Sequence, residues 1–411
     1  MPRLSRLQRL VYGLVTAGGL LVIAELLARG AWGQPPEPEL LARVARCTLQ
    51  EEAGRSFMTC GRTEGGADVP AKGARPRVVV LGGSSVNDPF KADPHDNFPE
   101  HLGARLAEVE VVNLGVAGMS VAGVSWLLSQ IDPLKPDLVV IYEGHNDYAQ
   151  TLFQGRITGT RLWMVDANRL LARSWIFALL ARREQGVDLW RNKAATPSAT
   201  GGPTPPAVCF SFTPSERRGT IPVTDDIALR IRDDLTARYR DDLVTAVAES
   251  PAPVVLSTLL RNPEYPPSGS LVTDRPYCAA ALPCLGHPAV TDHGALVDFA
   301  KAACGEEASI TAWVESRAAA EAGDKAGAEA AFDRSLALDA APLRAPREAD
   351  TIIREVAADR GTALVDLGQV IGPMPPAELF TDTLHPSSLG AARIAEALEP
   401  IVREKLGIAA R

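Results

Sequence analysis

The sequence predicts an α/β fold in three α/β/α layers, with a central parallel sheet of about five strands. Two observations predict it. Short runs of continuously apolar, mostly β-branched residues recur along the 411-residue chain, and segments with helical patterning separate them. Strands that are apolar on both faces are typical of a parallel sheet that helices cover on both sides. Such sheets bind ligands beyond the carboxyl ends of their strands, so the residues that follow each strand are the first candidates for a functional site.

Five apolar runs are the predicted strands: residues 77–81, 109–113, 137–142, 253–259 and 363–367. Helical patterning marks four further segments: residues 98–106, 122–131, 225–249 and 389–398. The alternation of the two kinds of segment favours crossover connections between parallel strands over hairpins.

The first 30 residues are predicted to be a signal-anchor or signal segment. Arg3, Arg6 and Arg9 precede an apolar run over residues 10–27, which only Glu25 interrupts. Basic residues favour the cytoplasmic side of a membrane, so we expect the rest of the chain on the other side. No clean small-residue cleavage site follows the run, which favours an uncleaved membrane anchor over a cleaved signal and a secreted protein. A buried core helix is the third alternative.

Six cysteines fit an exported chain, because an even number can form three disulfides in an oxidising compartment. They are Cys47, Cys60, Cys209, Cys278, Cys284 and Cys304. Cys47 and Cys60 are the most local pair, the other four allow three pairings, and free thiols are the alternative. The net charge of −8 and the lack of a basic patch argue against a nucleic-acid partner.

Residues 31–76 are predicted to be a juxtamembrane linker with one helix near residues 38–46. The α/β domain spans residues 77–411 and carries two insertions, at about 148–250 and 261–347. The second insertion ends in a helical hairpin at about 310–338 that is similar to a tetratricopeptide repeat. One such repeat cannot bury its own core, so we expect the hairpin to pack on the α/β domain.

Four short motifs follow predicted strands or lie near the C-terminus. They are Gly82-Gly83-Ser84-Ser85, Asn113 to Gly118, Gly144-His145-Asn146-Asp147, and Asp382-Thr383-Leu384-His385. Each is weak alone, but their order and their positions resemble those of the SGNH (GDSL-type) hydrolases. One departure stands out, since Gly83 occupies a position at which that family usually has Asp.

The resemblance implies a serine esterase with a flavodoxin-like SGNH fold. Ser84 would be the nucleophile, His385 its base and Asp382 the residue that orients the base. The Ser84 and Gly118 N–H groups and the Asn146 amide would form the oxyanion hole.

Three assignments stay open in the sequence. Ser85 is the second choice for the nucleophile, and Gly115 for the glycine donor. His145 lacks an acid partner at a suitable spacing, which argues against it as the base.

Further polar residues are candidates for substrate or metal binding. Arg261 and Asn262, directly after the fourth strand, are candidate substrate contacts. His287, Asp292 and His293 lack a third firm metal ligand, so we expect surface residues there and no metal site.

The expected function is hydrolysis of an O-acyl ester, in an acetylated glycan or a lipid, without a cofactor. An acyltransferase with the same fold, which passes the acyl group to a sugar hydroxyl, is the first alternative. A non-catalytic, membrane-anchored interaction protein that uses the helical hairpin is the alternative from another class. The complete set of five motif residues argues against this last function.

Overall fold

The computed structural model describes residues 6–32, 47–52, 55–60, 67–88, 91–93, 95–149, 174, 225–267, 284–285, 290–339 and 342–409. The chain divides into two compact units. One comprises residues 1–46 and 161–192, and the other comprises residues 47–160 and 193–411. The larger unit contains the predicted α/β fold.

The core of the larger unit is a five-stranded sheet in the order β5-β4-β6-β7-β8. The strands are β4 (Arg77–Gly82), β5 (Glu110–Asn113), β6 (Leu138–Tyr142), β7 (Val254–Ser257) and β8 (Ala363–Val365). All neighbours pair in parallel, and β4, β6 and β7 are buried along their whole length. The predicted fold class is confirmed.

The strand order reverses between β4 and β6. From β4 the chain crosses to β5 at one edge of the sheet, and later returns to β6 on the other side of β4. Ligands bind in open parallel sheets at such a switch point, outside the carboxyl ends of the strands. The loops after β4 and β6 therefore hold the topologically favoured position for a site.

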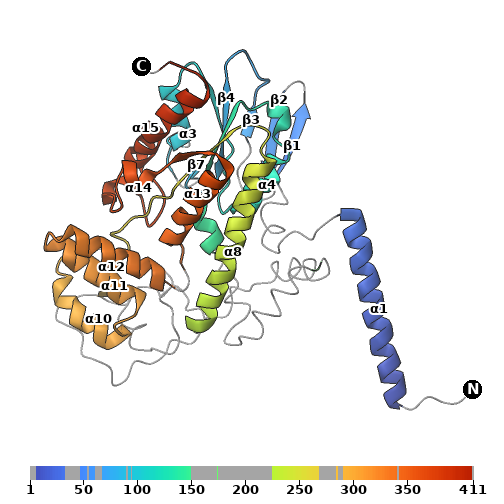
Figure 1. The fold of residues 1–411 in the computed structure, drawn as a ribbon, viewed down its shortest axis with the longest axis horizontal. Coiled ribbons are helices and arrows are strands. Elements are labelled where there is room, and N and C mark those ends of the chain that lie inside the picture. The colour runs from blue at the N-terminus through green and yellow to red at the C-terminus, as the bar shows by residue number, and fades with distance from the viewer. Residues whose placement is uncertain are drawn as a thin grey trace, which may run out of the picture. The chain divides into compact units, whose positions relative to one another are not determined.

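Helices cover both faces of the sheet (Figure 1). On one face α3 (Phe98–Arg105) packs against α15 (Ser388–Lys405). On the other face α8 (Asp225–Glu249) packs against α4 (Val121–Leu128) and α13 (Arg347–Arg360). Short helical turns complete the connections: η1 (Asp132–Leu134), α14 (Leu367–Val370) and η5 (Ala377–Leu379).

The N-terminal helix, α1 (Arg6–Trp32), belongs to the smaller unit. Glu25 forms an ion pair of 2.9 Å with Arg29 and also accepts a hydrogen bond of 2.9 Å from the Ser174 hydroxyl. Within the part of the chain that the structure describes, no helix is both long enough and apolar enough to cross a membrane.

Part of the segment predicted as a linker forms a small antiparallel sheet. Its strands are β1 (Cys47–Glu52), β2 (Arg55–Cys60) and β3 (Ala67–Val69). The sequence did not reveal them, because the stretch is rich in polar residues and lacks the apolar runs that mark a buried parallel strand. The helix expected near residues 38–46 lies outside the described residues.

The cysteines agree with an oxidised chain as far as they are described. Cys47 and Cys60 are Cα partners at the end of the β1–β2 ladder. Cys284 and Cys304 are both disulfide-bonded, and the described portion contains no free cysteine. Cys209 and Cys278 lie outside that portion, so the predicted pairing stays a prediction.

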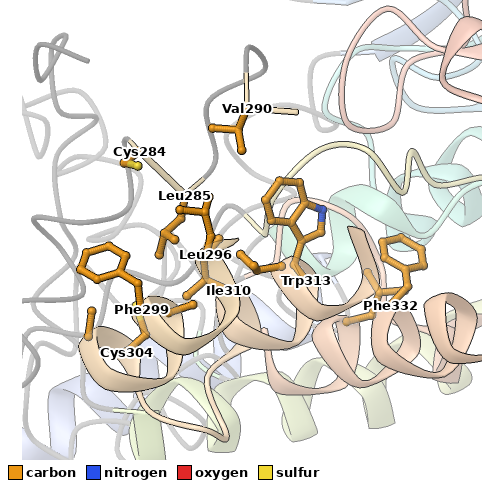
Figure 2. Close-up of a cluster of buried hydrophobic side chains, with 13 residues drawn as sticks. Cys284, Leu285, Val290, Leu296, Phe299, Cys304, Ile310, Trp313 and Phe332 are labelled. Carbon is orange, nitrogen blue, oxygen red and sulfur yellow. The ribbon is translucent and has the colours of Figure 1, made fainter. Parts of the chain in front are cut away.

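The second insertion forms a helical subdomain on the α/β domain. It consists of η4 (Gly294–Leu296), α10 (Val297–Cys304), α11 (Ser309–Glu321) and α12 (Lys325–Leu338), and the predicted hairpin is its α11–α12 pair. Figure 2 shows its apolar core, to which all three α-helices contribute. Trp313 lies in this core, and its indole Nε1 donates a hydrogen bond of 3.0 Å to the Pro263 carbonyl oxygen beyond β7.

Replacing Trp313 by Ala is expected to lower the free energy of unfolding by about 3–5 kcal/mol, the usual cost of removing a buried aromatic ring. Trp126→Ala is the matched control, because Trp126 on α4 is 48% exposed and Trp313 only 2%. That control is expected to stay within about 0.5 kcal/mol of the wild type. Urea unfolding followed by circular dichroism measures both. Equal effects of the two variants would contradict the assignment of Trp313 to a core.

Candidate active site

Ser84 lies on a tight turn directly after β4. The Gly83 carbonyl oxygen accepts hydrogen bonds from the N–H groups of Val86, at 3.0 Å, and Asn87, at 3.2 Å, which close the turn. Gly82 enters it beside β6, where a Cβ atom would lie 2.1 Å from the Tyr142 carbonyl oxygen. No side chain fits there, so this glycine is required for the strand to deliver Ser84 to the carboxyl edge of the sheet.

The candidate nucleophile, Ser84, and the candidate base, His385, are in direct contact. His385 Nε2 lies 2.7 Å from Ser84 Oγ, and His385 Nδ1 lies 2.7 Å from Asp382 Oδ2. This is the serine–histidine–carboxylate arrangement in which one ring nitrogen takes the hydroxyl proton and the other is held by the acid. The structure thus brings the three predicted residues together in this order, and it places Ser84 against the imidazole.

Asp382 is held as a carboxylate. Its Oδ1 accepts hydrogen bonds of 2.9 Å from the N–H groups of Leu384 and His385, while Oδ2 contacts the imidazole. Burial raises the pKa of Asp382, but the hydrogen bonds from His385 and the two backbone groups outweigh burial and lower that pKa to about 2. The acid is thus ionised at neutral pH and can stabilise an imidazolium when His385 takes a proton.

The loop that carries Asp382 and His385 is closed on itself. The Thr381 N–H donates to the His385 carbonyl oxygen at 2.9 Å, and Phe380 and Pro386 form an isolated β-bridge. These contacts fix His385 relative to Asp382 within the loop. The distance from His385 to Ser84 then depends on where the whole loop is held.

Asn262 sets that position from the loop that follows β7. Its N–H donates to the Thr383 carbonyl oxygen at 3.1 Å, and its side-chain Nδ2 donates to the Asp382 carbonyl oxygen at 2.9 Å. Its Oδ1 accepts from the Glu264 N–H at 3.0 Å. Asn262 therefore anchors the catalytic loop, and this corrects the expectation that it contacts the substrate.

Arg261 is also a structural residue. It is 1% exposed, and its guanidinium donates to the carbonyl oxygens of Leu259, Ala345 and Pro346 and to the Asp350 carboxylate. A buried charge with these partners stabilises the junction of β7 with α13 and does not reach a substrate. The expectation that Arg261 contacts the substrate is therefore wrong. A position after a strand predicts where the backbone lies, but it does not predict the direction in which the side chain points.

Three groups remain as oxyanion donors. Asn146 follows β6, and Gly118 lies in the loop after β5 with φ 76°, a left-handed conformation that favours glycine. Among the backbone hydrogen bonds of the described residues, none is donated by the N–H groups of Ser84 or Gly118. Gly115 is excluded, because its N–H donates to Asn113 Oδ1 at 2.9 Å.

Two other histidines are structural. His145 is buried; its Nδ1 accepts from the Ala345 N–H and its Nε2 lies 3.1 Å from the Leu260 carbonyl oxygen, in agreement with its exclusion as the base. Burial is the main reason that the pKa of His145 is well below its ordinary value.

His293, expected at the surface, is instead buried beside Trp313 and paired with Glu321. The described residues contain no cluster of three or more acidic, histidine or cysteine side chains that could hold a metal ion. His287 lies outside them.

The sequence did not point to two buried carboxyl groups, Glu143 and Asp147, that flank Asn146. Asp147 accepts hydrogen bonds from the Val121 N–H at the start of α4, at 3.1 and 3.2 Å. Glu143 accepts from the Gly144 N–H at 2.9 Å. The signal in the sequence was the position of these two acidic residues, one directly before and one within the motif that follows a fully apolar strand, where burial is expected.

No family model matches the chain, and no curated protein matches it. Solved structures similar to it include a lipase/acylhydrolase from Enterococcus faecalis (12% identity, 80% of this chain and 96% of the other, TM-score 0.35). Another is a putative lipolytic protein of the G-D-S-L family from Desulfitobacterium hafniense (9% identity, 80% of this chain and 99% of the other, TM-score 0.32). A third is an extracellular lipase from Streptomyces rimosus (14% identity, 80% of this chain and 99% of the other, TM-score 0.35). At these TM-scores, the function proposed below rests on the contacts within the site.

Asn262→Ala is expected to lower kcat for a short-chain ester by about 10- to 100-fold, because small displacements of a reacting group are costly. Thr381→Val is the matched control, since the Thr381 hydroxyl makes only an exposed contact of 3.3 Å with the same loop. Steady-state kinetics with both variants measure the difference. If Asn262→Ala changes KM alone and leaves kcat intact, Asn262 contacts the substrate after all.

Proposed function

We propose that the protein is a serine hydrolase that cleaves O-acyl esters. One observation carries the proposal: Ser84, His385 and Asp382 form a continuous relay of two 2.7 Å contacts at the carboxyl edge of the sheet. A structural role does not require a serine hydroxyl, an imidazole and a carboxylate in this order, whereas nucleophilic catalysis does.

In the proposed mechanism Ser84 Oγ attacks the ester carbonyl carbon while its proton passes to His385 Nε2. The negative charge on the former carbonyl oxygen is stabilised by the N–H groups of Ser84 and Gly118 and by the Asn146 amide. Collapse of this intermediate expels the alcohol, which takes the proton from His385 and leaves an acyl-enzyme. Water, deprotonated by His385, then releases the carboxylic acid and restores Ser84.

A hydrolase and the alternative acyltransferase differ in the molecule that receives the acyl group, which is water for the hydrolase and a sugar hydroxyl for the acyltransferase. Product analysis with an acetylated glycan or lipid ester, with and without an unacylated sugar, distinguishes them. Free acid in both reactions supports the hydrolase, and acylated sugar supports transfer. A protein inactive in both would favour the interaction protein that the helical hairpin suggested.

Ser84→Ala is expected to reduce hydrolysis of a short-chain ester by several orders of magnitude, leaving only the rate that binding and the oxyanion hole provide. Ser85→Ala is the matched control, because Ser85 has the same 8% exposure but no contact with His385. It is expected to keep most of the activity. Ester cleavage followed spectrophotometrically measures both, and equal losses would contradict the assignment of the nucleophile.

We also propose that the chain acts outside the cytoplasm. Arg3, Arg6 and Arg9 before the apolar run of residues 10–27 support export, as do the disulfides of Cys284 and Cys304. The protein would then be retained at the membrane by its N-terminal segment or secreted.

A reporter that is active only in an oxidising compartment, fused after Arg411, is expected to work in cells. Fractionation of the same cells then separates a membrane-retained from a secreted protein. The same fusion to a chain without residues 1–32 serves as the control and is expected to be inactive. A fusion active only in the cytoplasm, with all cysteines open to alkylation, would contradict the export proposal.

A further inference from the structure

The carboxyl group of Glu143 lies beneath the proposed oxyanion hole. Glu143 follows the last residue of β6 and is 4% exposed. Its Oε1 lies 3.3 Å from the Asn146 backbone N and 3.4 Å from Asn146 Nδ2. The Gly83 N–H donates to the same carboxyl group. One side chain therefore contacts both the amide that would bind the oxyanion and the turn that carries the nucleophile.

Gly83 leaves the space that this arrangement needs. A Cβ atom at position 83 would lie 2.1 Å from Asn146 Nδ2 and 2.6 Å from Glu143 Oε2. The φ angle of Gly83 is not positive, so other residues could adopt its backbone conformation. What excludes a side chain at this position is the lack of space. This is the position at which the first motif departs from the family that it resembles.

We propose that Glu143 is a positioning residue that orients the Asn146 amide, and that Gly83 is required to admit it. A carboxyl oxygen can accept from an amide N–H but cannot donate to the amide oxygen when it is ionised, so the contact turns Nδ2 toward the turn of Ser84. With one N–H engaged by Glu143, the second N–H is directed to the oxyanion. This inference rests on the proposed function and names a residue that acts through Asn146.

The electrostatics of the position are compatible with this role. Burial raises the pKa of Glu143 to about 7, and the hydrogen bonds from Gly144, Asn146 and Gly83 limit the increase. These hydrogen bonds favour the ionised form, in which both carboxyl oxygens can only accept from N–H groups.

A double-mutant cycle on kcat tests the proposal, with a short-chain ester and rates expressed per mole of folded protein. Asn146→Ala is expected to lower kcat by about 10²- to 10³-fold, as for loss of one oxyanion donor. Glu143→Ala is expected to lower kcat by about 10- to 100-fold, with KM changed by less than about twofold. In the Asn146→Ala background, Glu143→Ala is expected to cost less than about threefold more, because residues that act as a unit are not additive.

Two conservative variants separate orientation from folding. Glu143→Gln keeps the acceptor oxygen and is expected to recover most of the kcat lost in Glu143→Ala. Gly83→Ala is expected to lower kcat about as much as Asn146→Ala, because its Cβ displaces the amide. Gly73→Ala is the matched control, since a Cβ at this position meets nothing within 4 Å, and it is expected to match the wild type.

The outcomes are distinguishable. Wild-type kcat in Glu143→Ala or in Gly83→Ala would overturn the proposal, and so would a full additional loss from Glu143→Ala in the Asn146→Ala background. An active Ser84→Ala variant would instead overturn the proposed function. If Glu143→Ala fails to fold, Gly83→Ala still decides whether Asn146 is held as described.

Discussion

The hydrogen bond between Ser84 and His385 joins two loops 301 residues apart in the sequence, and the rest of the site maintains it. Ser84 is set by β4, at the centre of the switch point, where Gly82 packs against the backbone of β6. His385 comes from a loop beyond β8, at the far edge of the sheet. Because β6 and β7 separate β4 from β8, the loop of His385 must reach back over the sheet to bring Nε2 within 2.7 Å of Ser84 Oγ. Asn262, in the loop after β7, fixes the His385 loop in this position.

A layer of buried polar groups lies behind the loops and replaces the hydrogen bonds that water would supply. Arg261 bonds to Asp350 and to three carbonyl oxygens, Arg344 donates to the Asn262 carbonyl oxygen, and His145 bonds to two backbone groups. Each is costly to bury without partners. The partners come from the loop after β7, from the residues that precede α13 and from α13 itself, so these groups tie the loops after β6 and β7 to α13. The helical insertion adds to this layer through Trp313.

The fold was predictable from local patterns in the sequence, whereas the candidate triad came from the resemblance of four separate motifs to the SGNH hydrolases. Apolar runs identify buried parallel strands, and an Asp-x-x-His spacing is short enough for one loop to join Asp382 and His385. The roles of Arg261 and Asn262 were not predictable, since they depend on what lies opposite a strand end, in these cases α13 and the loop of Asp382. The three strands within residues 47–69 were not predicted, because their sequence is polar and lacks the apolar runs that mark a buried strand. Glu143 was not predicted because its proposed role depends on the space beside Gly83, which only the packing of β4 against β6 reveals.

Labelling with a fluorophosphonate, followed by peptide mapping, tests the central claim most directly. The reagent reacts with a serine only when a base removes its proton and an oxyanion hole accepts the developing charge. The account predicts a single phosphonylated peptide that carries the label on Ser84, and labelling that is strongly slowed in His385→Ala. Label on Ser85, label at the same rate in His385→Ala, or no label on the folded protein would contradict it.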